Sequence, residues 1–147
     1  MEAEAERALA KELFNGAWDL LERDGRTTTD DDAMLNMAHA SRHHWGNVGT
    51  PVNLARGEWQ CARVYAVLGR AEPATYHARR CLTLCEEHGI GDFDLAYAYE
   101  ALARAAAVAG DRAAVAAWLT RARATLTAVT EADDRAQVEA DLATVWR

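Results

Sequence analysis

The chain has 147 residues, half of them hydrophobic, which is enough for one domain with a continuous core and no disulfide or metal. Its net charge of -7 at pH 7 argues against the basic surface that nucleic-acid-binding proteins use. No stretch is apolar enough to span a bilayer, and the start MEAEAERALAKELF lacks the basic end and apolar core of a secretion signal. We therefore expect one cytoplasmic domain, residues 1–147, with neither a nucleic-acid nor a membrane partner.

The first predicted helix covers about residues 2–24, with Leu9, Leu13, Ala17 and Leu20 spaced three or four apart on one face. The run RTTTDDD follows it. Thr28 or Thr29 is expected to cap the second helix, since aspartates at the next positions suit the positive end of a helix. This second helix runs to about residue 47.

Thr50 is expected to cap the third helix, with Pro51 in the first turn, where a missing N–H costs nothing. The fourth helix opens at Glu72 and Pro73 by the same logic. Glycines recur at the predicted helix ends, and each is expected to adopt the left-handed conformation that stops a helix. They are Gly25, Gly49, Gly69, Gly89 and Gly110.

The fifth helix begins near Asp92 and ends at Gly110, and the sixth runs from Asp111 to about Val129. A final helix covers about residues 131–146. Alternation of polar and apolar residues is nowhere long enough to predict a strand. The expected fold class is therefore all-α, with seven helices.

Cys61, Cys81 and Cys85 are odd in number and lack the paired CxxC spacing of a zinc or redox site. In a reducing compartment they are expected to be free thiols that pack in the core. Lys11 is the only lysine, and arginine takes nearly every other basic position. This composition, together with the alanine content, suggests a bacterial genome rich in GC.

Two predicted helical hairpins match at an offset of 41 residues, which aligns Gly69 with Gly110. The first copy has an aromatic residue at position 65, a Leu-Gly end at residues 68–69 and Ala74 five residues after the glycine. The second copy has Ala106 where the aromatic residue of the first copy stands. These residues resemble a tetratricopeptide repeat (TPR) over about residues 55–128.

The family's usual repeat has about 34 residues, so the longer period predicts longer helices. The resemblance implies a TPR-like, right-handed superhelix of about three helical hairpins. The first helix of each hairpin would line a concave face, and residues 131–146 would form a C-terminal capping helix. It also implies a module that binds a protein or peptide on the concave face.

The same offset selects the side chains that this concave face would present to a ligand. They are Arg56 with Tyr97, Trp59 with Glu100, and Arg63 with Arg104. Two arginines in register beside aromatic rings suit an acidic peptide or a carboxylate terminus, because guanidinium groups bind carboxylates bidentately. The alternative is that Arg63, Glu100 and Arg104 form a solvated ladder of ion pairs along the helix faces.

Histidines four residues apart on a helix can chelate one transition metal ion, and His39 and His43 have this spacing. The third ligand would come from another helix, with Glu58, His77 and Glu100 as candidates. The alternative places both histidines on the polar face of the helix, opposite the apolar stripe, as exposed residues that bind metal only adventitiously.

Glu58 falls within an apolar stripe of the third helix, where an unpaired carboxylate would be costly to bury. We expect it to form an ion pair with Arg42 or a hydrogen bond with His44. The alternative is a functional carboxylate with a raised pKa that serves as a general base or metal ligand.

The sequence therefore predicts a binding module or scaffold that needs no cofactor. The alternative is a small metal-dependent or acid-base enzyme that uses His39, His43 and Glu58, with a transition metal ion as its cofactor. A third alternative is self-association into a homo-oligomer through apolar surface on the terminal hairpins.

Overall fold

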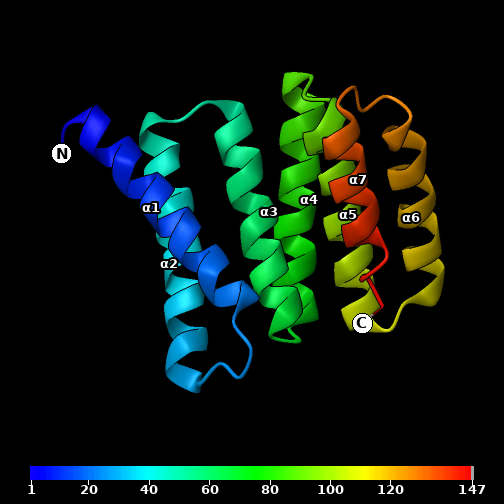
Figure 1. Cartoon of the computed structure of the whole chain (residues 1–147), viewed down its shortest axis with the longest axis horizontal. Coiled ribbons are helices and arrows are strands. Elements are labelled where there is room, and N and C mark those ends of the chain that lie inside the picture. Colours follow the sequence, from blue (N-terminus) through cyan, green and yellow to red (C-terminus); the bar gives the residue numbers. More distant parts are fainter. Residues whose placement is uncertain (147) are drawn as a thin grey trace.

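The computed structural model describes residues 1–146, and within that range it contains seven α-helices and no strand (Figure 1). The helices are α1 (Ala3–Glu22), α2 (Thr28–Val48), α3 (Pro51–Val67), α4 (Ala71–His88), α5 (Asp92–Ala109), α6 (Arg112–Leu126) and α7 (Ala132–Leu142). The predicted all-α fold class is thus confirmed. No helix of residues 1–146 has the length and hydropathy needed to cross a bilayer.

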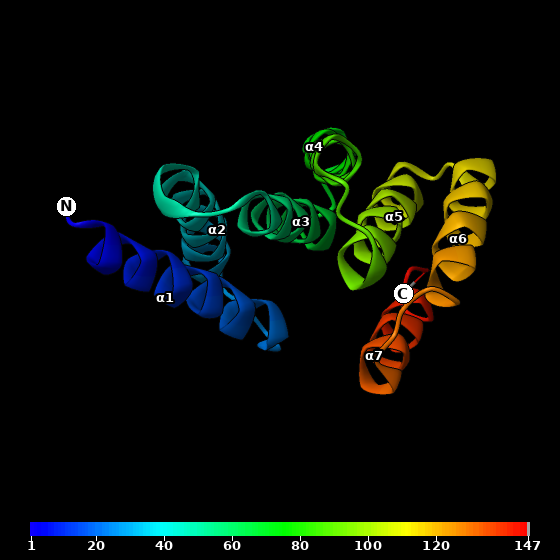
Figure 2. The same ribbon diagram turned by 90° about the horizontal axis from the view of Figure 1, so that it is seen from above.

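Each helix packs against the next one in the chain, which produces a row of hairpin-like pairs. α3 also packs against α5, and α5 against α7, so every second helix forms a continuous layer. The row bends, and α1 and α7 lie on the same side of α3 and α5 (Figure 2). This arrangement is compatible with a helical repeat.

The start of α2 differs from the prediction, because Thr27 caps the helix rather than Thr28 or Thr29. The Thr27 hydroxyl accepts a bond from the Asp30 N–H at 3.1 Å, and the Asp30 carboxylate accepts one from the Thr27 N–H at 3.0 Å. Thr28 and Thr29 also have an aspartate three positions later, so the sequence pattern fits all three threonines, and the helix begins after the first of them. Pro51 is the first residue of α3, as predicted.

Four of the five glycines that were predicted to end helices have the left-handed conformation, with φ between 62° and 75°. Gly49 was predicted to share it, but its φ is -93°. A Cβ atom there would lie 2.7 Å from the Trp45 carbonyl oxygen and 2.9 Å from the Trp45 ring. Gly49 is therefore needed for close packing at the end of α2 and not for its positive φ.

Alanines fill many of the contacts between helices and let the backbones approach closely, as at the fully buried Ala17, Ala38 and Ala78. All three cysteines are free thiols buried in this core, as predicted.

The last helix is shorter than expected and ends at Leu142, after which residues 143–146 form turns. Its buried side chains Val138 and Leu142 nevertheless pack against α5 and α6 around Tyr97 and Leu126. It therefore covers the exposed edge of the last hairpin, which is the position that was expected of a capping helix.

Candidate ligand-binding groove

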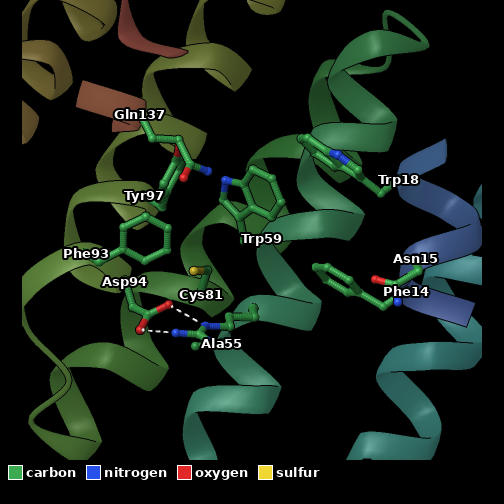
Figure 3. Close-up of a pocket in the computed structure, with 11 residues that line it drawn as sticks. Phe14, Asn15, Trp18, Ala55, Trp59, Cys81, Phe93, Asp94, Tyr97 and Gln137 are labelled. Atoms are coloured by element: carbon green, nitrogen blue, oxygen red, sulfur yellow. Dashed lines mark hydrogen bonds and ion pairs between the residues drawn. The ribbon is translucent and has the colours of Figure 1, made fainter. Parts of the chain in front are cut away.

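A pocket of about 300 Å³ lies on the side of the molecule where α1 and α7 flank α3 and α5. Five of its eleven lining residues are aromatic, and they come from α1, α3 and α5 (Figure 3). The lining residues are Phe14, Asn15 and Trp18 of α1; Ala55, Arg56 and Trp59 of α3; Cys81 of α4; Phe93, Asp94 and Tyr97 of α5; and Gln137 of α7. We call this pocket and its walls the groove.

Four of the five aromatic rings of the groove pack against one another in a continuous chain. The centroid of the Trp59 ring lies 5.7 Å from that of Trp18 and 5.4 Å from that of Tyr97, and Tyr97 lies 4.9 Å from Phe93. These are the tilted and edge-to-face geometries that aromatic pairs prefer. The positions of these four rings are therefore supported by mutual packing.

One ion pair borders the groove. The Arg56 guanidinium donates two hydrogen bonds to the Asp94 carboxylate, at 2.8 Å and 3.1 Å, and the pair raises the pKa of Arg56. Asn15 and Gln137 are exposed and contribute amide groups from α1 and α7. The groove thus combines an apolar floor with polar groups on its rim.

A cluster of buried charges centred on Glu100 lies directly beside the groove. The Glu100 side chain is fully buried and accepts hydrogen bonds from Trp59 Nε1 at 3.0 Å, Arg63 at 3.1 Å and Arg104 at 2.7 Å. Both guanidinium groups are therefore paired within the protein.

The sequence left open whether Arg63 and Arg104 face a ligand or pair with Glu100. In the structure both guanidinium groups form ion pairs with the Glu100 carboxylate. The expected ladder was solvated, and that part was wrong. The side chains of Arg63 and Arg104 are only 16% and 11% exposed, because α7 and the turn after it cover this edge of α5.

Arg104 of the Glu100 cluster also forms hydrogen bonds with the end of α7 and the turn after it, and α7 forms one wall of the groove. Arg104 donates to the Asp141 carbonyl oxygen at 3.0 Å and to the Thr144 hydroxyl at 2.8 Å. The Tyr97 hydroxyl donates to the Asp141 carboxylate, and burial together with this bond raises the pKa of Tyr97. The position of α7 is thus set by polar contacts in addition to its apolar face.

The opposite wall, α1, is held by two buried polar side chains. Gln60 donates to the Phe14 carbonyl oxygen at 2.9 Å, and Ser41 donates to the Ala10 carbonyl oxygen at 2.8 Å. Each bond reaches the middle of α1 from a different neighbouring helix. The two walls of the groove are therefore fixed independently of each other.

Glu58 lies in a second cluster, between α2, α3 and α4. It accepts hydrogen bonds from Arg42 at 3.0 Å and from His77 at 2.7 Å, which confirms the predicted pair with Arg42. His44 instead contacts Glu6 at 2.9 Å. Burial alone would raise the pKa of Glu58, but the contacts with His77 and Arg42 hold it below its ordinary value.

His39 was placed on the polar face of its helix, and this prediction was wrong. Its ring is half-buried, contacts the Tyr65 hydroxyl at 2.9 Å and lies 5.3 Å from the ring of His77. The reason is that α2 packs against both α1 and α3, so its buried surface is wider than one apolar stripe.

His43 is exposed, and its ring contacts that of His44. The two predicted metal ligands therefore contact different neighbours. Among residues 1–146, no three His, Cys, Asp or Glu side chains are grouped so that they could hold a metal ion.

Of the six predicted ligand-binding residues, the structure brings Arg56, Trp59 and Tyr97 into the groove and the other three into the Glu100 cluster. Sequence reasoning missed the α1 wall. The offset of 41 residues, applied once more toward the N-terminus, pairs Trp18 with Trp59 and Asn15 with Arg56. The same periodicity could therefore have identified this wall.

No protein-family model matches this chain, and neither a curated protein nor a solved structure does.

Proposed function

We propose that this chain is a TPR-like binding module that holds a peptide segment of a partner protein in the groove between α1 and α7. The observation that carries the proposal is the aromatic pocket of about 300 Å³ on the side that α1 and α7 flank. A preformed apolar pocket with a few polar groups is the usual form of a ligand site.

The hydrogen-bonding atoms of the two central rings are already used. Trp59 donates its N–H to Glu100, and Tyr97 donates its O–H to Asp141. These aromatic side chains therefore offer apolar ring surface rather than free donors, although the Arg63 guanidinium already lies 5.9 Å from the centroid of the Trp59 ring and Tyr97 is largely buried. Aromatic surfaces of this kind supply large contact area at a low cost in side-chain entropy, which suits the anchoring of an apolar group.

The rim of the groove suits a peptide backbone. Asn15 and Gln137 are exposed on different walls, and a carboxamide group can both donate and accept hydrogen bonds. Peptide groups also contain one donor and one acceptor each. An extended segment along the groove can thus satisfy its backbone at the rim while a side chain enters the aromatic pocket.

Selection from a random peptide library displayed on phage tests this proposal. The wild-type protein is expected to enrich peptides with a common motif. An Asn15→Trp variant, in which a large ring fills the groove from an exposed helix position, is expected to lose them. Tyr76→Ala is the control, because Tyr76 is an exposed aromatic residue on α4, outside the groove. Enriched peptides that bind both variants as well as the wild type would contradict the proposal.

A further inference from the structure

On the face of the molecule opposite the groove, a cluster of side chains bridges α2 and α4. These two helices lie on one side of α3, and α1 lies on the other (Figure 2). No Cα atom of α2 lies within 8 Å of a Cα atom of α4, so the two helices have no direct backbone contact. Their side chains meet at His39 of α2 and His77 of α4, whose ring centroids are 5.3 Å apart. The two rings are thus placed to influence how far α2 lies from α4.

Both rings are also joined to α3 by polar contacts. His39 Nε2 lies 2.9 Å from the Tyr65 hydroxyl, and His77 Nδ1 lies 2.7 Å from the Glu58 carboxylate. The titratable and charged groups around His39 are His77 from α4, Glu58, Cys61 and Tyr65 from α3, Arg42 from its own helix, and Arg70, whose guanidinium lies over the Tyr65 ring. From α1, Glu6 pairs with His44 and not with His39. One carboxylate, Glu58, therefore serves the whole cluster.

A proton on His39 gives this cluster an excess of positive charge. Burial and the charge of His77 lower the pKa of His39 below 6.5, and the pKa of Glu58 lies below 4.5, so Glu58 stays charged while His39 titrates. The Glu58 carboxylate is already shared between Arg42 and His77. Two protonated rings at this distance repel each other, and water screens the repulsion only weakly because His39 is half-buried. The repulsion acts between α2 and α4.

α1 and α2 form one body that can transmit this force to the groove. α1 packs along α2, and Ser41 of α2 donates to the Ala10 carbonyl oxygen of α1 at 2.8 Å. Because α3 lies between the cluster and the groove, a displacement of α2 away from α4 rotates the α1–α2 hairpin about α3. The rotation carries α1 toward α7. Small sliding movements of packed helices are a common form of conformational change.

We propose that protonation of His39 rotates the α1–α2 hairpin about α3 and narrows the groove. The cluster is then a histidine switch that acts from the opposite face of the molecule. One consequence rests on the proposed function: the narrower groove binds its peptide less tightly at acidic pH. The ring pair of Trp18 and Trp59, with centroids 5.7 Å apart, joins α1 to α3 and reports the movement directly.

An NMR titration of the free protein from about pH 7.5 to about pH 5 tests the movement without any ligand. We expect the Trp18 indole N–H signal to shift with the same midpoint as the ring protons of His39, and the Trp118 signal from α6 to stay in place. His39→Gln should abolish the Trp18 shift, and His43→Gln, at an exposed position of the same helix, should keep it. A Trp18 signal that does not move in the wild type, that still moves in His39→Gln, or that stops moving in His43→Gln would overturn the proposal.

His77→Gln separates repulsion from a local effect of the His39 ring. Glutamine can still donate a hydrogen bond to Glu58, but it carries no charge. His39 is expected to titrate in this variant while the Trp18 signal stays in place. A Trp18 shift as large as that of the wild type would contradict repulsion between the two rings as the cause.

A peptide from the phage selection that has no titratable group tests the consequence for binding. We expect its dissociation constant to increase at least about five-fold between pH 7.5 and pH 5.5 in the wild type, and to stay constant in His39→Gln. Equal affinity at both pH values in the wild type would overturn the link between the switch and the groove. Failure of the phage selection would instead contradict the proposed function, and the titration of the free protein would still decide whether the hairpin moves.

Discussion

At the scale of single residues, the Glu100 carboxylate both pairs with two arginines and positions a ring of the groove. It neutralises Arg63 and Arg104, and it accepts the hydrogen bond of Trp59 on the floor of the groove. A fully buried carboxylate is tolerated only when its oxygens are bonded in this way. The residue therefore links the stability of the fold to the placement of the groove's central ring.

Glu100→Gln is expected to destabilise the protein by about 3–5 kcal/mol, because two largely buried guanidinium groups would lose their shared counter-charge. Asp94→Asn removes the partner of Arg56, whose side chain is 51% exposed, and should cost under about 1 kcal/mol. Urea unfolding of both variants measures the difference. Similar losses in the two proteins would show that the Glu100 cluster contributes no more than a surface ion pair.

The Glu58 cluster gives the protein a pH-dependent stability. Burial and the charge of His77 lower the pKa of His39 below its ordinary value of 6.5, and the pKa of Glu58 is lowered below 4.5. In both cases the unfolded chain binds protons more readily, so the contribution to stability is present above the ordinary pKa and is lost as the pH falls. The His39 contribution is lost first, just below pH 6.5.

The urea midpoint should therefore decrease between about pH 7.5 and pH 5.5, and decrease less in a His39→Gln variant, which has no titrating ring at this position. His43→Gln is the control, because His43 is exposed. Identical pH profiles for the wild type and His39→Gln would contradict the assigned role of His39.

Single residues were predicted well where the pattern of one helix face required a partner on the helix next to it in the chain. The apolar stripe around Glu58 required a partner, and Arg42 provides it. The second partner, His77, comes from α4 and could not be inferred, because the contact depends on how three helices meet. For the same reason Glu100 was expected to be solvated, since nothing in α5 itself indicates that α7 covers it.

At the scale of the helices, their ends are set by two different properties of glycine. Gly69, Gly89 and Gly110 stop helices through positive φ angles, whereas Gly49 stops α2 in a space that admits no Cβ atom. Only the first property can be recognised in a sequence. The ends of α4 and α5 were therefore predicted closely, whereas the conformation at Gly49 was not, and the ends of α6 and α7, which no glycine follows, were placed too late.

Gly110→Ala should destabilise the protein by about 1 kcal/mol, because an L-residue is strained at φ 75° even where space is open. Gly91→Ala should change stability by less than about 0.5 kcal/mol, since Gly91 has a negative φ and a Cβ atom there would have no neighbour within 4 Å. The melting temperatures of the two variants, compared with that of the wild type, measure this difference in stability. Equal shifts would mean that conformation at Gly110 does not terminate α5.

At the scale of the whole molecule, the groove depends on helices at opposite ends of the chain. α1 is held by Gln60 and Ser41, and α7 by Arg104 and Tyr97, and both flank the rings of α3 and α5. The repeat in the sequence predicted the residues of the two central helices. The curvature that brings α1 and α7 to the same side is a property of the packing and was accessible only from the structure.

The five tryptophans of the chain allow one direct test of the central claim, because each indole N–H gives its own NMR signal. Trp18 and Trp59 line the groove, whereas Trp118 packs against Tyr99 and the Trp146 ring faces Arg112, outside it. Titration with a peptide from the phage selection should shift the indole signals of Trp18 and Trp59 and leave those of Trp118 and Trp146 in place. Shifts confined to Trp118 and Trp146 would place the binding site elsewhere and contradict the account.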